Sequence, residues 1–160
     1  MRPIPIRRRS GFTILELLIV FVVFGLVVMI SIRSVGDTLR RDKTVKAAHL
    51  LGADIEQAFA VAARQRMPVY LILNESNRTL SVIDWDTLPA KKVYRRRSFA
   101  KTSEYGVDTL YANRDTIIIM PNGIATNTMD ITLLISSRGG APYTKKVSVS
   151  KGGMVLVNNR

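Results

Sequence analysis

The hydrophobic and polar positions change their pattern twice along the chain. From Phe12 to Ile32, 21 residues are almost all apolar, and Glu16 is the only charged one. A helix of that length spans roughly 31 Å, about the hydrocarbon thickness of a bilayer. The pattern therefore predicts a membrane-spanning helix, and it leaves one carboxylate among apolar side chains that needs an explanation.

After residue 33 the apolar residues recur at steps of three and four, which predicts an amphipathic helix. The apolar positions are Val45, Ala48, Leu51 or Leu50, Ile55, Ala58 or Phe59, and Ala62; the polar residues between them are Lys43, Lys46, Asp54, Glu56 and Arg64. The first proline after this stretch is Pro68, which pushes Met67 out of helical geometry. We therefore predict one helix from about Thr13 to Arg66, whose second half packs through one apolar stripe.

From Val69 on, short β-type runs alternate with turn signals. Val69–Leu73 and Thr79–Asp84 flank the turn at residues 74–78 and predict a hairpin. Further strands are predicted at residues 93–94, 116–120, 130–136, 143–150 and 154–157, with turns at 121–123, 139–140 and 152–153. The predicted fold class is α+β: a long N-terminal helix, its first half transmembrane, packed on a C-terminal antiparallel β domain.

Composition removes some kinds of chemistry. The chain has no cysteine, which excludes disulfides, thiolate metal sites and cysteine nucleophiles. Its formal net charge is +12, and Arg2, Arg7, Arg8 and Arg9 precede the apolar run. A basic balance is compatible with nucleic acid or an anionic surface as a partner, but it does not locate a site.

The N-terminus fits two ordinary membrane signals incompletely. A secretory signal peptide has a shorter apolar region and an Ala-x-Ala cleavage site, which the residues after Ile32 do not supply. A plain signal-anchor, with Arg7–Arg9 held in the cytoplasm, explains the arginines and the length of the apolar run. It explains neither Gly11 at the boundary between charge and apolar run nor Glu16.

The stretch Ser10-Gly11-Phe12-Thr13-Ile14-Leu15-Glu16-Leu17 resembles the class III signal of prepilins and pseudopilins, found in type IV pili and type II secretion systems. The resemblance implies cleavage between Gly11 and Phe12 by prepilin peptidase, N-methylation of Phe12, and Glu16 as the fifth residue of the mature chain. The division it implies is a cleaved leader at 1–11, a transmembrane and assembly helix at 12–33, its amphipathic extension at 34–67, and a β-rich globular domain at 68–160.

Two interpretations of Glu16 stand beside each other. In the first, which the resemblance supplies, its carboxylate pairs with the α-amino group of an adjacent subunit's Phe12 and sets the axial register between subunits. In the second, the side chain reaches the lipid headgroups, and the positive end of the helix dipole favours it there.

The β part resembles the GspH/FimT group of minor pseudopilins and thus implies the pseudopilin fold. The similar features are the Pro121-Asn-Gly123 loop, a helix ending in Ala62-Ala-Arg64 before a Val-led strand, and a last strand after Gly152-Gly153. Some DNA-uptake members carry Gly-Arg-x-Arg near the C-terminus. The matching stretch here, Gly153–Leu156, has no arginine, which counts against DNA uptake through that strand.

No catalytic residue, metal site or cofactor is predicted. His49 is the only histidine, and Asp84-Trp-Asp86 lies beside an expected turn with no partner base. A Gly-x-Ser-x-Gly elbow and a glycine-rich phosphate loop are both absent from the sequence. A membrane-anchored enzyme is therefore disfavoured.

One basic patch is a candidate site for anions or nucleic acid. It comprises Lys91, Lys92, Arg95, Arg96, Arg97 and Lys101. Tyr94 and Phe99 flank the arginines, and basic residues interleaved with aromatic ones can bind single strands by charge and stacking. The alternative is a solvated loop that attracts anionic lipid or an acidic partner subunit.

The resemblance therefore implies a minor pseudopilin, a structural subunit of a type II secretion pseudopilus or type IV pilus-like filament and not an enzyme. The partners implied are prepilin peptidase, other pilin or pseudopilin subunits and an inner-membrane assembly platform. The predicted location is the bacterial inner membrane, crossed once, with the leader cytoplasmic and the C-terminal domain periplasmic. The rival prediction is a DNA-binding minor pilin that uses the basic patch.

Overall fold

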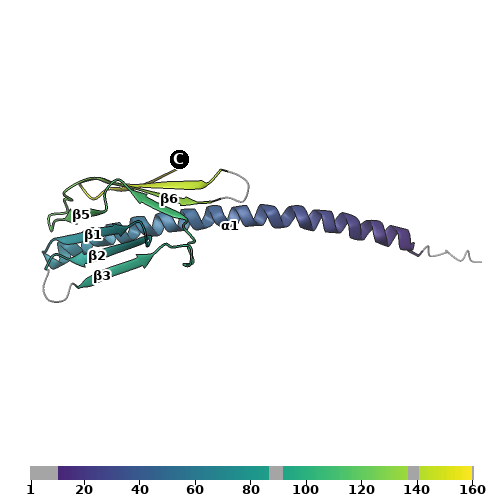
Figure 1. Cartoon of the computed structure of the whole chain (residues 1–160), viewed down its shortest axis with the longest axis horizontal. Helices are drawn as coiled ribbons and strands as arrows, with labels where there is room; N and C mark the ends of the chain where they lie inside the picture. The colour runs from purple at the N-terminus through teal and green to yellow at the C-terminus, as the bar shows by residue number, and fades with distance from the viewer. Residues whose placement is uncertain (1–10, 87–91, 137–140, 160) are drawn as a thin grey trace, which may run out of the picture. The chain divides into compact units, whose positions relative to one another are not determined.

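The computed structural model describes residues 11–86, 92–136 and 141–159 (Figure 1). It divides into two compact units, Met1–Gly36 and Asp37–Arg160. The described residues form one helix, α1 (Ile14–Gln65), followed by β1 (Val69–Asn74), β2 (Thr79–Asp84), β3 (Val93–Ser98), β4 (Thr109–Ala112), β5 (Thr116–Ile119), β6 (Met129–Ile135), β7 (Tyr143–Val149) and β8 (Val155–Asn159). The expectations for the leader, including Arg7–Arg9, and for the turn at 139–140 lie outside the described residues.

Both ends of α1 follow from local chemistry. At the start, Oγ1 of Thr13 accepts the backbone N–H of Glu16 at 3.2 Å, which caps the first turn. At the end, Arg66 adopts a φ of 54°, a left-handed conformation that cannot continue the helix, and Pro68 follows. The helix predicted from Thr13 to Arg66 is confirmed to within one residue at each end.

In the second unit the strands form two antiparallel sheets. One has the strand order β3-β2-β1-β5 and the other β4-β6-β7-β8. The predicted hairpin is the β1–β2 pair, in which Val69 lies opposite Asp84 and Asn74 opposite Thr79. The predicted α+β class, a long helix followed by antiparallel strands, is confirmed.

Two strands differ from the sequence prediction. The sequence analysis missed β4, whose four residues Thr-Leu-Tyr-Ala alternate between exposed and buried but are too few to give a clear period. The strand predicted at residues 93–94 continues to Ser98 through three arginines. A run of like charges looks like a solvated loop, yet alternate side chains of a strand point to opposite faces, so the strand separates them.

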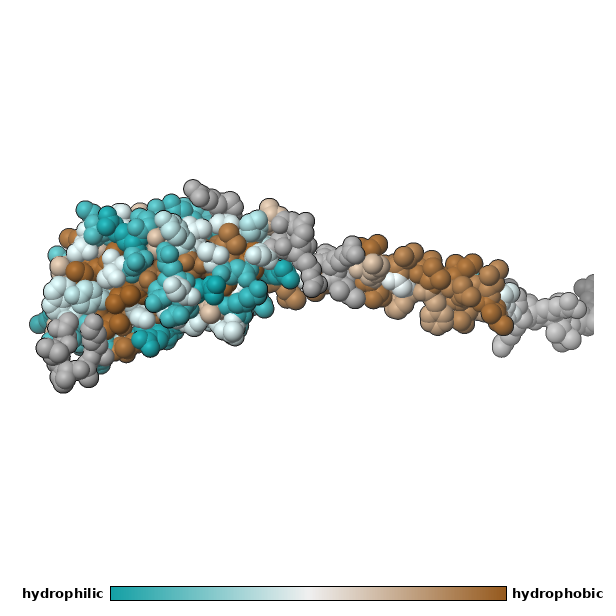
Figure 2. All heavy atoms as spheres, in the orientation of Figure 1, coloured by the Kyte–Doolittle hydropathy of each residue, from teal (hydrophilic) through white to brown (hydrophobic). Residues whose placement is uncertain are grey.

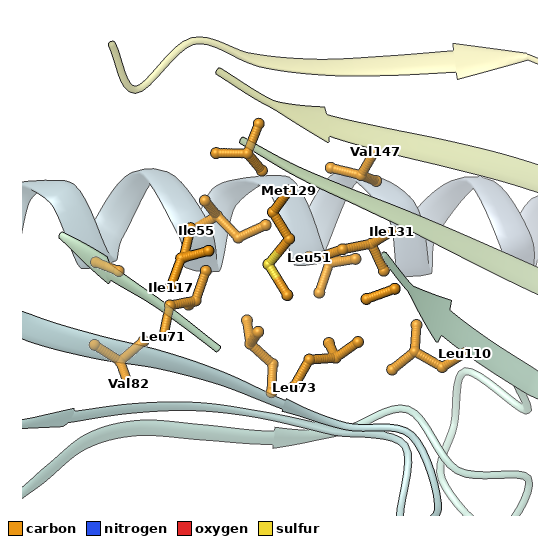
Figure 3. Packing of buried hydrophobic residues seen from close by; sticks show 14 of the residues in the cluster. Leu51, Ile55, Leu71, Leu73, Val82, Leu110, Ile117, Met129, Ile131 and Val147 are labelled. Atoms are coloured by element: carbon orange, nitrogen blue, oxygen red, sulfur yellow. The ribbon is translucent and has the colours of Figure 1, made fainter. Parts of the chain in front are cut away.

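The core of the second unit is one cluster of buried apolar side chains contributed by α1 and both sheets. Figure 3 shows Leu51 and Ile55 of α1 pointing toward Leu71 and Leu73 of β1 and toward Met129 of β6. These five side chains are at most 1% exposed. The second half of the helix therefore packs on the β domain through an apolar stripe, as predicted.

The stripe is broader than predicted and includes a charge. Ala47 and Val61 are buried, and of the two neighbouring leucines it is Leu51 that is fully buried. Asp54 was assigned to the polar positions of the helix, which is wrong, because only 2% of it is exposed. Its carboxylate accepts hydrogen bonds from Arg95 and Arg97 of the basic patch, which connects the helix to β3.

Candidate processing and assembly site

The backbone around Gly11 and Phe12 is open and non-helical. Both residues precede α1, and Phe12 is 79% exposed. Apart from its two chain neighbours, no described residue has an atom within 4 Å of where a Cβ would stand on Gly11. Apart from their immediate neighbours, no described residue covers the bond between the two residues. That it is the bond cleaved, and that Phe12 is methylated, stay predictions.

Glu16 lies in the first turn of α1, and its side chain is exposed. Its backbone N–H is bound by Thr13, and Thr-x-x-Glu is the spacing of a capping box. Its carboxylate makes no hydrogen bond or ion pair with any described residue. The chain thus provides Glu16 with a favourable helix end but with no cation among these residues, and both interpretations of Glu16 stay open.

The helix surface beyond Glu16 is apolar all round. In the first unit every large apolar side chain from Phe12 to Ile30 is between 39% and 87% exposed. Figure 2 shows this part of the helix as a nearly continuous hydrophobic surface. Within the described residues, α1 is the one helix long and apolar enough to cross a membrane. A helix that is apolar on every side requires lipid or other helices around it.

Two arginines of the basic patch are occupied by Asp54. The Nε of Arg95 donates to Oδ1 of Asp54 at 3.1 Å, and Nη2 of Arg97 donates to the same oxygen at 3.0 Å. The Nε of Arg97 also donates to Oδ2 of Asp54, so Arg97 grips the carboxylate with two nitrogens. These bonds join α1 to β3.

The electrostatics of Arg97 follow from this contact. Its hydrogen bond to Asp54 raises the pKa of the guanidinium above its ordinary value, although burial acts in the opposite direction. Its Nη1 donates to the hydroxyl of Tyr105 at 3.0 Å. Arg97 is therefore a fixed cation with its partners inside the fold, and it is not available to a phosphate backbone.

The other members of the patch are dispersed. Arg96 points to the opposite side of β3 and is exposed, Lys92 lies 5.2 Å from the ring centroid of Tyr94, and Lys101 pairs with Asp108 at 3.4 Å. Lys91 lies outside the described residues. Phe99, which would stack bases in the DNA-binding alternative, is fully buried. The DNA-binding alternative is therefore not supported.

The remaining polar candidates do not form a reactive site. His49 is exposed on α1. Asp84 accepts the hydroxyl of Tyr94 at 3.2 Å, and burial, followed by the charge of Asp84, raises the pKa of that tyrosine. No group of three or more metal-ligating side chains occurs in the part of the chain that the structure describes.

Asp54 is the residue that the sequence analysis missed, and a signal for it was present. It stands three residues after Leu51 and four before Ala58, so it shares their helix face. A single acid on an apolar stripe, together with alternate arginines on a strand, predicts a buried ion pair.

Comparison with known proteins agrees with both parts of the chain. Residues 6–32 match the family model of the prokaryotic N-terminal methylation motif. The structure is similar to the type IV minor pilin FimU of Pseudomonas aeruginosa, with a TM-score of 0.57 and 15% identity over 74% of this chain and 90% of that one. It is also similar to the minor pseudopilin EpsH from the type 2 secretion system of Vibrio cholerae, with a TM-score of 0.59 and 8% identity over 73% and 97%.

A second crystal form of FimU gives a TM-score of 0.51 at 17% identity, covering 71% of this chain and 90% of that one. No curated protein sequence matches the chain significantly. The motif accounts for the N-terminal segment, and the structural likeness accounts for the fold. The chain therefore carries a prokaryotic N-terminal methylation motif on a long apolar helix and has the fold of minor pilins and minor pseudopilins.

Proposed function

We propose that this protein is a minor pseudopilin or minor pilin, a structural subunit that assembles through the first half of α1. The observation that carries the proposal is a helix that begins two residues after Phe12, is apolar on every side in its first half, and holds Glu16 with no partner among the described residues. The methylation motif over residues 6–32 supports it independently.

The physical basis of assembly is an exchange of neighbours. Apolar side chains that face lipid in the membrane face other helices in a filament, so extraction need not expose them to water. Packing density between helices is high, and many small dispersion contacts replace those made with lipid tails. Apolar packing alone, however, allows neighbouring helices many axial offsets of nearly equal energy.

Glu16 supplies the register that apolar packing lacks. After cleavage, Phe12 would carry a new α-amino group four residues before the carboxylate. In a medium of low dielectric, an ion pair between Glu16 and a neighbour's amine forms at only one axial offset, and other offsets leave a charge unpaired. The geometry of the free chain supports this role, because nothing described in the chain itself neutralises Glu16.

The topology we propose places the leader arginines in the cytoplasm and the β domain in the periplasm, in accordance with the positive-inside rule. Prepilin peptidase and an inner-membrane assembly platform are the partners that this route requires. The role is structural, not enzymatic. The filament is either a type II secretion pseudopilus or a type IV pilus.

Intact-mass measurement tests the processing. Co-expression of the full chain with a prepilin peptidase should give a product that begins at Phe12 and carries one added methyl group. Gly11→Val, which places a branched side chain beside the bond, should leave the full-length mass. A chain that stays unprocessed with the peptidase present, or one cut near Ser31, would contradict the proposal.

A second measurement tests the role of Glu16. Glu16→Ala and Glu16→Gln should be cleaved like the natural chain, because the scissile bond is unchanged. Both should enter filaments poorly, as measured by the fraction of mature subunit that sediments with sheared filaments. Glu16→Gln is the sharper variant, since it keeps the size and removes the charge. Its normal incorporation would refute the register argument.

A further inference from the structure

A basic groove lies in the second unit where α1 meets the loop between β3 and β4. Its volume is about 230 Å³, and it is open to solvent. Three cations line it, Arg40 and Lys43 from α1 and Lys101 from the loop, together with Asp108 and Ser136. Arg40 and Lys43 are three residues apart on the helix and therefore project from the same face.

The single acid in the groove is already satisfied within the fold. Oδ2 of Asp108 accepts the backbone N–H of Ser136 at 2.6 Å, and Oδ1 lies 3.4 Å from Nζ of Lys101. The hydrogen bond from Ser136 is the main reason that the pKa of Asp108 is lowered, and Lys101 adds to it. Asp108 therefore stays ionised, and it balances one of the three cations.

The other two cations, Arg40 and Lys43, keep N–H donors that no described residue uses. Arg40 uses Nη1 to donate to the carbonyl oxygen of Ser136 at 2.9 Å, which fixes the guanidinium at the groove. Lys43 makes no hydrogen bond or ion pair with any described residue, and its side chain is exposed. A fixed guanidinium beside a flexible ammonium is the combination that recognises phosphate oxygens, the first by its planar fork and the second as a point charge.

The position of the groove along the chain indicates where such a phosphate would come from. Arg40 is eight residues after Ile32, so at most about 28 Å of chain separates it from the end of the apolar run. Basic residues are usually depleted beyond the translocated end of a membrane helix. Here five of them, Arg33, Arg40, Arg41, Lys43 and Lys46, follow the apolar run within 14 residues, against the two acids Asp37 and Asp42. This cationic excess requires a reason other than topology.

We propose that the groove of Arg40, Lys43 and Lys101 binds a phosphate group, supplied by the headgroup of an anionic phospholipid of the membrane that holds the apolar helix. The inference rests on the proposed function only in that the apolar run lies in a bilayer. It does not depend on cleavage, methylation or filament formation. Bound headgroups would hold the start of the second unit at the membrane surface.

The test uses the full chain in detergent micelles and native mass spectrometry. The chain is titrated with phosphatidylglycerol, with phosphatidylcholine and with inorganic phosphate. We expect the natural chain to retain phosphatidylglycerol preferentially, and the double variant Arg40→Gln/Lys43→Gln to retain it about tenfold more weakly. The matched control is Arg41→Gln/Lys46→Gln, which changes the charge equally on the same helix segment but not in the groove.

The outcomes separate the alternatives. Equal weakening in the two double variants, or none in either, would overturn the site. Binding of inorganic phosphate that depends on Arg40 and Lys43, without retention of phosphatidylglycerol, would keep the phosphate site and overturn the headgroup assignment. Asp108→Asn removes the acid from the groove and should strengthen lipid retention. A variant that merely loses its fold does not bind more tightly, so stronger retention by Asp108→Asn would support the groove. Unchanged or weaker retention by an Asp108→Asn chain that unfolds in urea like the natural chain would contradict the proposal.

Discussion

The two halves of α1 belong to one continuous helix, yet they differ in where their apolar side chains find partners. In the first half, large apolar residues cover every side and stay exposed, as at Leu18, which is 56% exposed. In the second half, apolar residues form one stripe, and Leu51 is fully buried by the β domain. A stripe can be satisfied by one chain, whereas a helix that is apolar all round requires a membrane or other subunits.

Asp54 and Glu16, two carboxylates of α1, differ in the same way: only one of them has its partners within the chain. Asp54 is buried, and its partners Arg95 and Arg97 come from the same chain. Glu16 is exposed and has no partner among the described residues. A buried carboxylate with its own cations stabilises one fold, whereas a carboxylate without them can contribute to an interface. Asp54 therefore serves folding, and Glu16 is the carboxylate that we propose serves assembly.

The largest expected effect tests whether apolar side chains in the two halves of α1 contribute differently to the stability of the fold. Leu51→Ala should lower the free energy of unfolding by about 3 kcal/mol, because it removes buried contacts and leaves a cavity. Leu18→Ala should change it by less than about 0.5 kcal/mol, since its side chain contacts no core. Both can be measured by urea unfolding of the full chain in detergent, with the fluorescence of Trp85 as reporter. Similar losses in the two variants would break the comparison.

The next effect concerns the carboxylates. Asp54→Asn leaves two arginines without their counter-charge and should lower the free energy of unfolding by about 2 kcal/mol, less than a fully buried pair because the Arg95 side chain is 42% exposed. Glu56→Gln, two residues along the same helix and exposed, is the matched control and should change little. Glu16→Gln should also leave unfolding unchanged. A loss with Glu16→Gln as large as with Asp54→Asn would show that both acids serve the fold.

Sequence reasoning reached the parts of this structure that depend on local period and on a motif. The limits of α1, its apolar stripe and most strands were predicted, because 3.6-residue periodicity and proline chemistry act within a few residues. Asp54 contacts two arginines of β3 that lie far from it in the sequence: Arg95 is 41 positions further along the chain, and Arg97 is 43. The sequence pattern can mark Asp54 as an acid on the apolar face and the arginines as alternating on a strand, but nothing local shows that these two segments meet. The four-residue β4 was missed for a related reason, since pairing with β6 defines it more than its own pattern does.

The groove of Arg40, Lys43 and Lys101 was beyond sequence reasoning for the same reason. Its cations belong to two segments that the sequence analysis treated separately, one as helix polar face and one as basic patch. Only the fold brings Lys101 to the helix, with Asp108 and Ser136 between them. Sites built from a single segment, such as Gly11-Phe12 with Glu16, can be proposed from sequence, whereas those built across segments require coordinates.

A smaller effect compares glycines from the two regions. Gly153 has a φ of 80°, and a Cβ there would come within 3.1 Å of the ring of Phe59 on α1. Gly153→Ala should therefore lower the free energy of unfolding by about 1–2 kcal/mol through left-handed strain and crowding. Gly25, in the first half of α1, has nothing within 4 Å of the Cβ position apart from its chain neighbours and the backbone of the helix itself. Gly25→Ala should not lower the stability of the β domain, because the position is open and alanine has a higher helix propensity than glycine. Unfolding in urea measures both variants.

The smallest effect is a pH dependence from two carboxyls of the second unit. The pKa of Asp108 is lowered chiefly by the Ser136 N–H, and that of Asp130 chiefly by its hydrogen bond with Lys146. A carboxyl whose pKa is lower in the folded state binds protons more readily when unfolded. Its stabilisation is therefore complete above the unfolded pKa, near 4, and is lost as the pH falls through the folded pKa.

We expect the free energy of unfolding to be level above about pH 5 and to fall below about pH 4. Each carboxyl should contribute under about 1 kcal/mol, because Lys101 is 78% and the Asp130 side chain 42% exposed. Urea titrations at a series of pH values, on the natural chain and on Asp130→Asn, measure this. Asp130→Asn should reduce the fall in the free energy of unfolding below pH 4, whereas an unchanged fall would mean that carboxyls other than Asp130 govern the acid stability of the β domain.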